Sequence, residues 1–153
     1  MPKLDDTDRR IIRALQQNAR MSNLELAAKV GLSPSPCLRR VRLLEEAGVI
    51  ERYVAIVNGE KAGVGLVVLA RVQFTTQSTD TTLQFLETIR RYPEVTECFL
   101  TTGECDAVLK IVTADLHEYW RFQANRLTSI ETVKEVKTDV VMEVGKQSFE
   151  LPI

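Results

Sequence analysis

The chain has 153 residues with 44% hydrophobic side chains, which supports a packed core in one domain or two small ones and argues against intrinsic disorder. The formal net charge is −1 at pH 7, which excludes a protein that covers nucleic acid with a uniformly basic surface. The charge is uneven, because residues through Val57 hold 10 basic and 7 acidic side chains whereas the remainder holds 10 and 14, and this favours a polyanion-binding module joined to a differently used domain.

Two helices are predicted in the first 31 residues. The first runs from about Asp5 to Gln17, where an acidic start suits the positive end of the helix dipole. The second follows Ser22, which can form a capping box with Glu25, and it ends at Gly31, where a left-handed backbone costs little.

A third helix is predicted after Ser33, with Pro34 at its first position, where the missing N–H is no loss. Apolar residues recur along it at intervals of four and three and predict its buried face: Cys37, Val41 and Leu44. Gly48 ends this helix, and Val49–Val57 is predicted to be a strand, the wing of a winged helix-turn-helix. Residues 58–63 are rich in turn formers and predict a hinge, which divides the chain into domains 1–60 and 61–153.

The second domain has the predicted order β-α-β-β-α-β, which indicates a ferredoxin-like sheet with two helices and places the whole chain in the α+β class. The predicted elements are strands 64–74, 95–102, 107–112 and 133–142, and helices 79–92 and 115–128. In the first strand, alternate residues from Val64 to Phe74 line one face, while Val67 and Leu69 leave the other face partly apolar. Because two helices cover only one face of such a sheet, we expect the second face to be a dimer interface.

The third helix carries a cluster of arginines that is typical of a helix entering a DNA groove: Arg39, Arg40 and Arg42. At about 100° per residue, Arg39 and Arg42 lie opposite the apolar face, and arginine can hold guanine O6 and N7 with two hydrogen bonds. The predicted DNA-contacting residues are Ser22, Asn23, Ser33, Ser35, Pro36, Arg39, Arg40 and Arg42. Two alternatives stay open: a solvated basic face, and an Arg40 that pairs with Glu45 or Asp8 inside the domain.

The sequence resembles the leucine-responsive regulator/AsnC family of transcription factors over nearly its whole length. Four segments carry the resemblance: LDDTDRRIIRALQQNAR, SNLELAAKVGLSPSPCLRRVRLLEEAGVI, TTGECDAVLKI and VVMEVGKQS. The resemblance implies a DNA-binding dimer formed through the second domain, often four dimers in an octamer, and an amino-acid effector held near contacts between dimers. A helix-turn-helix dimer reads two half-sites, so the operator is expected to be a near-palindromic double-stranded DNA.

The resemblance also implies an effector site at the turn between the second and third strands of the second domain. The residues alone favour a plain hairpin turn, in which Gly103 supplies a positive φ. The predicted effector-binding residues are Leu100, Thr101, Thr102, Gly103, Glu104, Cys105, Asp106 and Asp139. The backbone near Gly103 would take the α-carboxylate and Asp106 the α-ammonium. Cys105 stands where the family usually has Tyr or Phe, which predicts a larger or differently shaped pocket, and Asp139 leaves room for a polar or basic effector side chain.

Neither a cofactor nor a metal site is predicted, because the three cysteines form no CxxC pair and His117 is the only histidine. The longest apolar run is far below the roughly 20 residues of a membrane helix, and the first residues lack an apolar signal core, so a soluble, cytoplasmic protein is expected. Two competing functions are disfavoured. The acidic, histidine-poor second domain argues against a tetrapyrrole decarboxylase of similar fold, and the arginine-rich helix argues against an amino-acid sensor without DNA binding.

Overall fold

The structure, a computed structural model, describes residues 3–153 and divides into two compact units. The first unit holds the residues up to Ile56 together with Lys146–Ile153, and the second holds Val57–Gly145. The division near residue 60 therefore lies within a few residues of the sequence-based boundary. The last eight residues differ, because the sequence assigned them to the second domain and the structure places them in the first unit.

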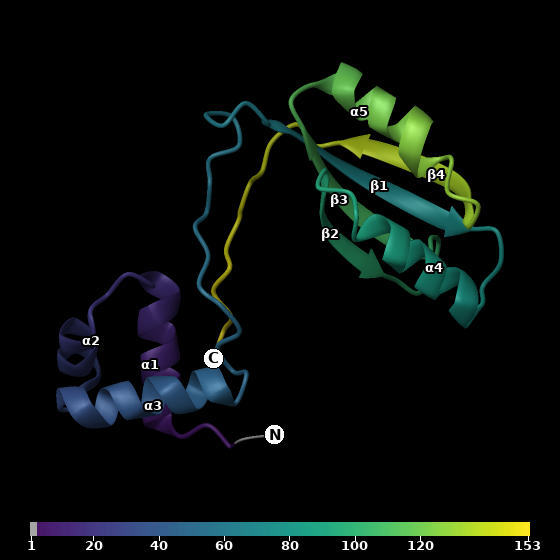
Figure 1. The fold of residues 1–153 in the computed structure, drawn as a ribbon. Coiled ribbons are helices and arrows are strands. Elements are labelled where there is room, and N and C mark those ends of the chain that lie inside the picture. Colours follow the sequence, from purple (N-terminus) through teal and green to yellow (C-terminus); the bar gives the residue numbers. More distant parts are fainter. Residues whose placement is uncertain (1–2) are drawn as a thin grey trace. The chain divides into compact units, whose positions relative to one another are not determined.

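Three helices form most of the first unit: α1 (Asp6–Gln17), α2 (Asn23–Val30) and α3 (Pro34–Glu46) (Figure 1). The capping box of Ser22 and Glu25 is present, and a second one joins Asp5 to Asp8 at the start of α1. Gly31 ends α2 with a φ of 71°, in the left-handed region that favours glycine. Ser33 lies at the N-cap position of α3, but its side chain makes no capping hydrogen bond, so fixing this helix start falls to Pro34.

The core of the first unit lies between the three helices, with the side chains of Ile11 and Cys37 fully buried and Leu44 5% exposed. The carboxy-terminal segment adds to it, since Ile153 packs against the cluster. Gln16 of α1 holds this segment by both of its amide atoms: Oε1 accepts from the Leu151 N–H at 2.6 Å, and Nε2 donates to the Leu151 carbonyl at 3.2 Å. These contacts explain why residues 146–153 belong to the first unit.

The prediction of a strand over Val49–Val57 is wrong for this structure. Val49 and Ile50 pack against the helical core, but residues 51–57 have no strand partner among residues 3–153. The β-branched residues that suggested a strand are exposed instead, with Val54 at 64% and Ile56 at 68%. High β-propensity alone therefore did not make residues 51–57 a strand, because propensity does not supply a neighbouring strand with which to form hydrogen bonds.

The second unit confirms the βαββαβ order and the ferredoxin-like class. Its elements are β1 (Leu66–Phe74), α4 (Thr79–Ile89), β2 (Val95–Leu100), β3 (Ala107–Thr113), α5 (Leu116–Phe122), the π-helical turn η1 (Gln123–Leu127) and β4 (Val133–Val140). The strands form one sheet in the order β2-β3-β1-β4, and every neighbouring pair is antiparallel. Several elements are shorter than predicted: β1 begins at Leu66, β2 ends at Leu100, the first helix ends at Ile89 and the last strand at Val140.

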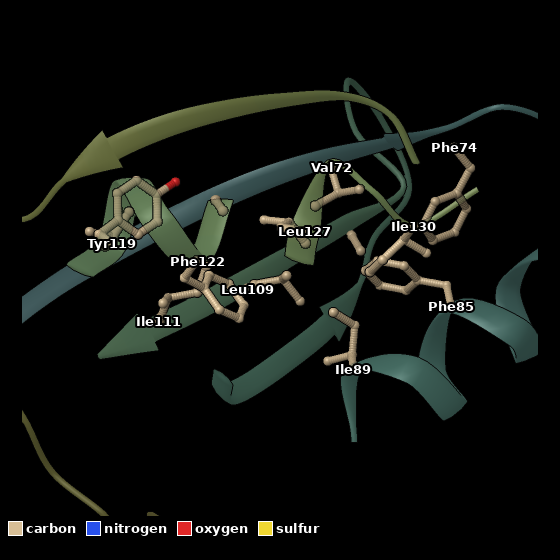
Figure 2. Packing of buried hydrophobic residues seen from close by; sticks show 13 residues of the cluster. Val72, Phe74, Phe85, Ile89, Leu109, Ile111, Tyr119, Phe122, Leu127 and Ile130 are labelled. Carbon is tan, nitrogen blue, oxygen red and sulfur yellow. The ribbon is translucent and has the colours of Figure 1, made fainter. Parts of the chain in front are cut away.

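The core of the second unit lies between one face of the sheet and the two helices (Figure 2). Alternate residues of β1 point into it, with Val68 and Val72 fully buried, and β3 contributes Leu109 in the same way. Phe85 from α4 and Leu127 from η1 are also fully buried. Each buried side chain of this size stabilises the fold by about 1.5–3 kcal/mol. This layer therefore fixes the position of α4 and η1 against the sheet.

The opposite face of the sheet has no helix over it within the second unit. Leu69 is 37% exposed and Phe99 is 54% exposed, and they lie among charged pairs such as Arg71–Asp139 at 2.7 Å. This face is called the open face below. No helix within residues 3–153 is both long and apolar enough to cross a membrane.

Candidate functional site

The exposed side of α3 is formed as the sequence predicted. Ser35, Pro36, Arg39 and Arg42 are exposed, while Cys37 on the other side is fully buried. Neither Arg39 nor Arg42 forms an ion pair with any of residues 3–153. Both guanidinium groups are therefore available to an anionic partner.

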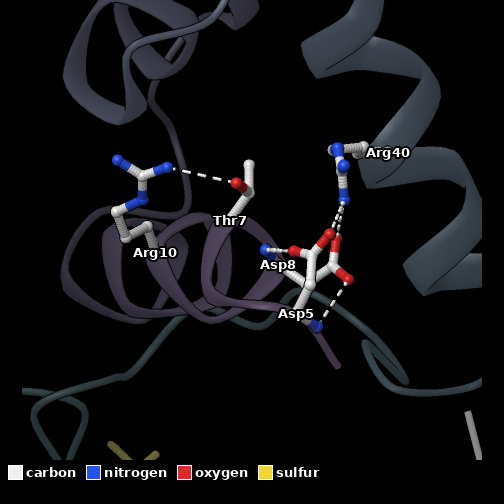
Figure 3. Close-up of polar contacts among 5 residues, drawn as sticks. All are labelled: Asp5, Thr7, Asp8, Arg10 and Arg40. Atoms are coloured by element: carbon white, nitrogen blue, oxygen red, sulfur yellow. Dashed lines mark hydrogen bonds and ion pairs between the residues drawn. The ribbon is translucent and has the colours of Figure 1, made fainter. Parts of the chain in front are cut away.

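Arg40 differs from its neighbours because it is bound inside the unit (Figure 3). Its Nη1 atom donates to Asp8 Oδ1 at 2.7 Å and to Asp5 Oδ2 at 2.8 Å. The same two aspartates form the capping box of α1, where the Asp8 N–H donates to Asp5 Oδ1 at 2.8 Å. Arg40 thereby ties α3 to the first turn of α1, which is the alternative that the sequence left open with Asp8 as its partner.

The electrostatics of this cluster agree with its geometry. Hydrogen bonds to the Asp8 and Asp5 carboxylates raise the pKa of Arg40, so its charge is held at every ordinary pH. The hydrogen bond from the Asp8 N–H, followed by that from Arg40, lowers the pKa of Asp5. Arg40 was predicted as a DNA contact, and its guanidinium is engaged here by two carboxylates.

The start of α2 is held by local bonds. Ser22 is used by its capping box, in which its N–H donates to Glu25 Oε2 at 2.8 Å. Asn23 Nδ2 donates to the carbonyl of Pro34 at 2.8 Å and so links the first turn of α2 to that of α3. Its Oδ1 is buried without a hydrogen-bond partner among residues 3–153. The two helix starts are thus joined by a side chain that the sequence assigned to phosphate binding.

A cavity of about 730 Å³ lies in the second unit between α4 and the β2–β3 turn. Five of the predicted effector residues line it: Leu100, Thr101, Thr102, Gly103 and Asp106. The turn is fixed by the Thr101 N–H, which donates to the Asp106 carbonyl at 3.0 Å, and by a φ of 129° at Gly103. A side chain at Gly103 would be strained, so the turn depends on glycine.

Asp106 is the one charged residue among those lining this cavity. Its Oδ2 accepts from the Phe74 N–H at 2.7 Å, and its Oδ1 accepts from Gln77 Nε2 at 3.1 Å. A carboxylate offers about four acceptor positions, so two positions are used and two are free for a ligand donor. The carboxylate thus holds the end of β1 while still presenting acceptor capacity to the cavity.

Comparison with known proteins identifies both units. Residues 4–51 match the model of a winged helix-turn-helix DNA-binding domain. Residues 67–151 match that of the Lrp/AsnC ligand binding domain. The chain belongs to the Lrp/AsnC family of transcriptional regulators.

Whole-chain matches agree with this Lrp/AsnC assignment. The chain is 40% identical over 150 residues to the transcriptional regulator AzlB of Bacillus subtilis, covering 98% of this chain and 96% of that one. It is 38% identical to the leucine-responsive regulatory protein of Escherichia coli, covering 98% and 92%. Among solved structures, a transcriptional regulator of Neisseria meningitidis in complex with L-methionine has a TM-score of 0.93 at 37% identity, covering 98% and 97%.

Three predicted effector residues of this Lrp/AsnC chain lie elsewhere. Glu104 and Cys105 line a separate small cavity of about 20 Å³ together with Arg71 and other residues, and not the large one. Asp139 pairs with Arg71 on the open face at 2.7 Å. Cys105 therefore does not set the size of the large cavity, and Asp139 supplies no charge to it.

The second wall of the cavity was not predicted from the sequence. This wall comes from the end of β1 and from α4, and its residues include Phe74, Gln77, Thr79, Thr82, Leu83 and Leu86. One signal was present in the sequence: Leu83 is a large apolar residue outside the buried face of its helix, and it is 59% exposed. Exposed apolar side chains beside a turn of this kind are the residues to test first.

Proposed function

We propose that this protein is a sequence-specific DNA-binding regulator whose DNA affinity responds to a free amino acid bound between α4 and the β2–β3 turn. The observation that carries the proposal is the cavity of about 730 Å³, which combines an apolar wall with a single carboxylate, Asp106. The L-methionine complex of the similar Neisseria regulator supports an amino-acid ligand. A ligand changes DNA binding only through its different affinities for the states of the protein.

The lining favours an effector with an uncharged, apolar side chain. The side chains of Leu83, Leu86 and Leu100 offer a ligand an apolar surface. No cationic residue lines the cavity to pair with an acidic side chain. The free acceptor positions of Asp106 would take the α-ammonium, and the backbone at Gly103 the α-carboxylate. Methionine and leucine are the first candidates. The basic side chain that Asp139 suggested has no support, because Asp139 pairs with Arg71 on the open face.

Calorimetric titration of the full-length protein with the twenty amino acids tests this site. We expect binding below about 1 mM for at least one apolar amino acid, and a loss of about tenfold or more in Asp106→Asn, which keeps the shape but removes the charge. Glu104→Gln is the matched control, since it neutralises a nearby carboxylate that does not line the cavity. Equal losses in both variants, or no binding at all, would refute the site.

For DNA, we propose that Arg39 contacts a base and Arg42 a phosphate, because both are exposed on α3 and neither is paired with residues 3–153. Arg39→Ala should cost about 1–3 kcal/mol and relax preference at one position in each half-site. Arg42→Ala should weaken all sequences alike and reduce the salt slope by about one. Selection from fragmented genomic DNA gives the operator for both measurements, and unchanged affinity in both variants would contradict the assignment.

We further propose a homodimer through the open face that assembles to a higher oligomer, with an octamer as the expected size. The exposed Leu69 and Phe99 support a partner on this face, and so does the family. Light scattering that gives a monomer at micromolar concentration would overturn the proposal. We assign the protein to the cytoplasm and to a non-enzymatic role, on the basis of relatives that are transcriptional regulators.

A further inference from the structure

A π-helical turn interrupts the end of the second helix of the ligand-binding unit. The chain leaves α5 at Phe122 and continues as η1, where the Thr128 N–H donates to the Gln123 carbonyl at 3.0 Å. Leu127 anchors the turn because it is fully buried. Turns of this kind are rare and occur frequently at functional sites. Here η1 carries Asn125 and Arg126 to the surface, where both residues line two cavities.

The first of these cavities is lined by two acidic and two basic side chains. It has a volume of about 220 Å³, and its charged residues are Glu94, Glu118, Arg121 and Arg126. Their formal charges cancel, so the cavity does not select a simple anion or a simple cation by net charge. Its volume is below that of a typical drug-sized site and suits a ligand of about ten heavy atoms.

Only half of the charges in this cavity are paired with one another. Arg126 Nη1 donates to Glu94 Oε1 at 2.8 Å, and its guanidinium lies 5.7 Å from the Tyr92 ring centroid. Glu118 and Arg121 form no ion pair with any of residues 3–153. Both side chains are exposed, so one carboxylate and one guanidinium line the same small cavity with solvent, and no partner among residues 3–153, to balance their charges.

Two buried polar atoms beside these charges lack partners. Glu94 Oε2 and Thr132 Oγ1 are covered and have no hydrogen-bond partner within residues 3–153. Glu94 lines the first cavity and Thr132 the second, which has a volume of about 340 Å³. Each such atom costs free energy until a donor or acceptor reaches it.

We propose that the cavity beside η1 binds a small zwitterion, a free α-amino acid with a polar, uncharged side chain, at a site separate from the proposed effector cavity. Arg121 takes the α-carboxylate, and Glu118 with Glu94 takes the α-ammonium. The amide of Asn125 receives the polar side chain. The two sites differ in chemistry, because the cavity at Asp106 has one charged residue and three leucines, whereas this one has four charged residues.

L-Glutamine is the probe, and hydrogen–deuterium exchange of the full-length protein locates it. We expect slower exchange in peptides covering residues 116–132, and a weaker effect from glutarate, which lacks the ammonium, and from putrescine, which lacks the carboxylate. Calorimetry should show about tenfold weaker glutamine binding in Arg121→Gln. Arg90→Gln is the matched control, an exposed arginine that lines neither cavity, and it should bind as the parent does.

Three results would overturn the site. The first is no slowing of hydrogen exchange in residues 116–132 at about 10 mM glutamine, a concentration well above the dissociation constant expected for an effector. The second is protection confined to peptides around residues 74–86 and 100–106, which would place glutamine in the effector cavity and leave the proposed function standing. The third is equal binding of glutarate, putrescine and glutamine. Failure of the proposed function would be seen separately, because no apolar amino acid would then bind in the cavity that Asp106 lines.

Discussion

Arg40→Ala tests whether this arginine supports the DNA-reading helix from inside the unit. The substitution removes the one side chain whose guanidinium joins α3 to the first turn of α1 through Asp5 and Asp8. It leaves the exposed Arg39 and Arg42 unchanged. If the reasoning is right, the variant loses stability of the helical unit and loses DNA affinity only as a consequence.

The size of the effect follows from the exposure of the partners. Arg40 is 32% exposed and Asp8 is 16% exposed, so their contact belongs at the upper end of the range for partly exposed pairs, about 1 kcal/mol. Asp5 is half-exposed, and its contact adds little because water screens it. Loss of the packed arginine stem brings the total to about 1–2 kcal/mol, which lowers the melting temperature of a small unit by several degrees.

Urea unfolding and operator binding at several salt concentrations together measure both effects. Arg39→Ala is the matched control, because that arginine is exposed and unpaired within residues 3–153, and it should leave the unfolding midpoint within experimental error. Asp8→Asn should reproduce the stability loss of Arg40→Ala. In the double variant the two losses should not add, since each removes the same contact.

The opposite pattern would refute this role for Arg40. If Arg40→Ala unfolds at the same urea concentration as the parent, while its operator affinity falls and its salt slope drops by about one, then Arg40 contacts a phosphate directly. Asp8→Asn would then free the arginine and strengthen DNA binding. Either result would show that Arg40 contacts DNA directly.

Three further outcomes are expected. Partial burial of the ring, followed by the bond from its hydroxyl to Glu45 at 2.9 Å, raises the pKa of Tyr53 to about 12, so any stability from the neutral phenol is complete below pH 10 and lost as the pH rises toward 12. Burial also raises the pKa of Tyr119, so absorbance titration of Tyr53→Phe should show one late-ionising tyrosine fewer than the parent, and no difference between the two would contradict the contact. Gln16→Ala should release the tail at Leu151 and speed proteolysis after residue 146, whereas an unchanged cleavage rate would show that the tail is held elsewhere. Phe85→Ala should cost about 3–5 kcal/mol because the ring is fully buried, and a loss below about 1 kcal/mol in chemical unfolding would mean that the core had collapsed around the gap.

Local rules predicted most of the helical unit. Capping at Ser22, the end of α2 at Gly31 and the buried face with Cys37 all depend on residues within one or two turns of each other, and the structure confirms them. The strand over Val49–Val57 failed because a strand needs a partner that local sequence cannot specify. The fate of Arg40 also depended on a long-range contact, since Asp5 lies 35 positions away.

In the second unit, alternation along β1 and the turn at Gly103 predicted the sheet and one wall of the cavity. The other wall could not be predicted, because α4 approaches the turn only through the tertiary packing of Phe85 and Ile89 against the sheet. Asp139 points away from the cavity for a related reason, because alternate residues of a strand point to opposite faces and local sequence does not specify the register that decides the face. Cys105 belongs to the turn itself, where strand alternation does not apply.

The hold of Gln16 on the carboxy-terminal tail has a consequence for synthesis on the ribosome. Helix α1 leaves the ribosome well before Leu151 and Ile153, which contact its unit, because Leu151 follows Gln16 by 135 positions. The intervening residues 57–145 take roughly 5–20 s to translate at ordinary rates. During that interval the nascent helical unit exposes the apolar surface that Ile153 later covers. A chaperone would therefore meet a DNA-binding unit whose helices are formed but whose apolar surface is not yet covered by the carboxy-terminal segment. A chain shortened by an early stop codon would keep that surface exposed.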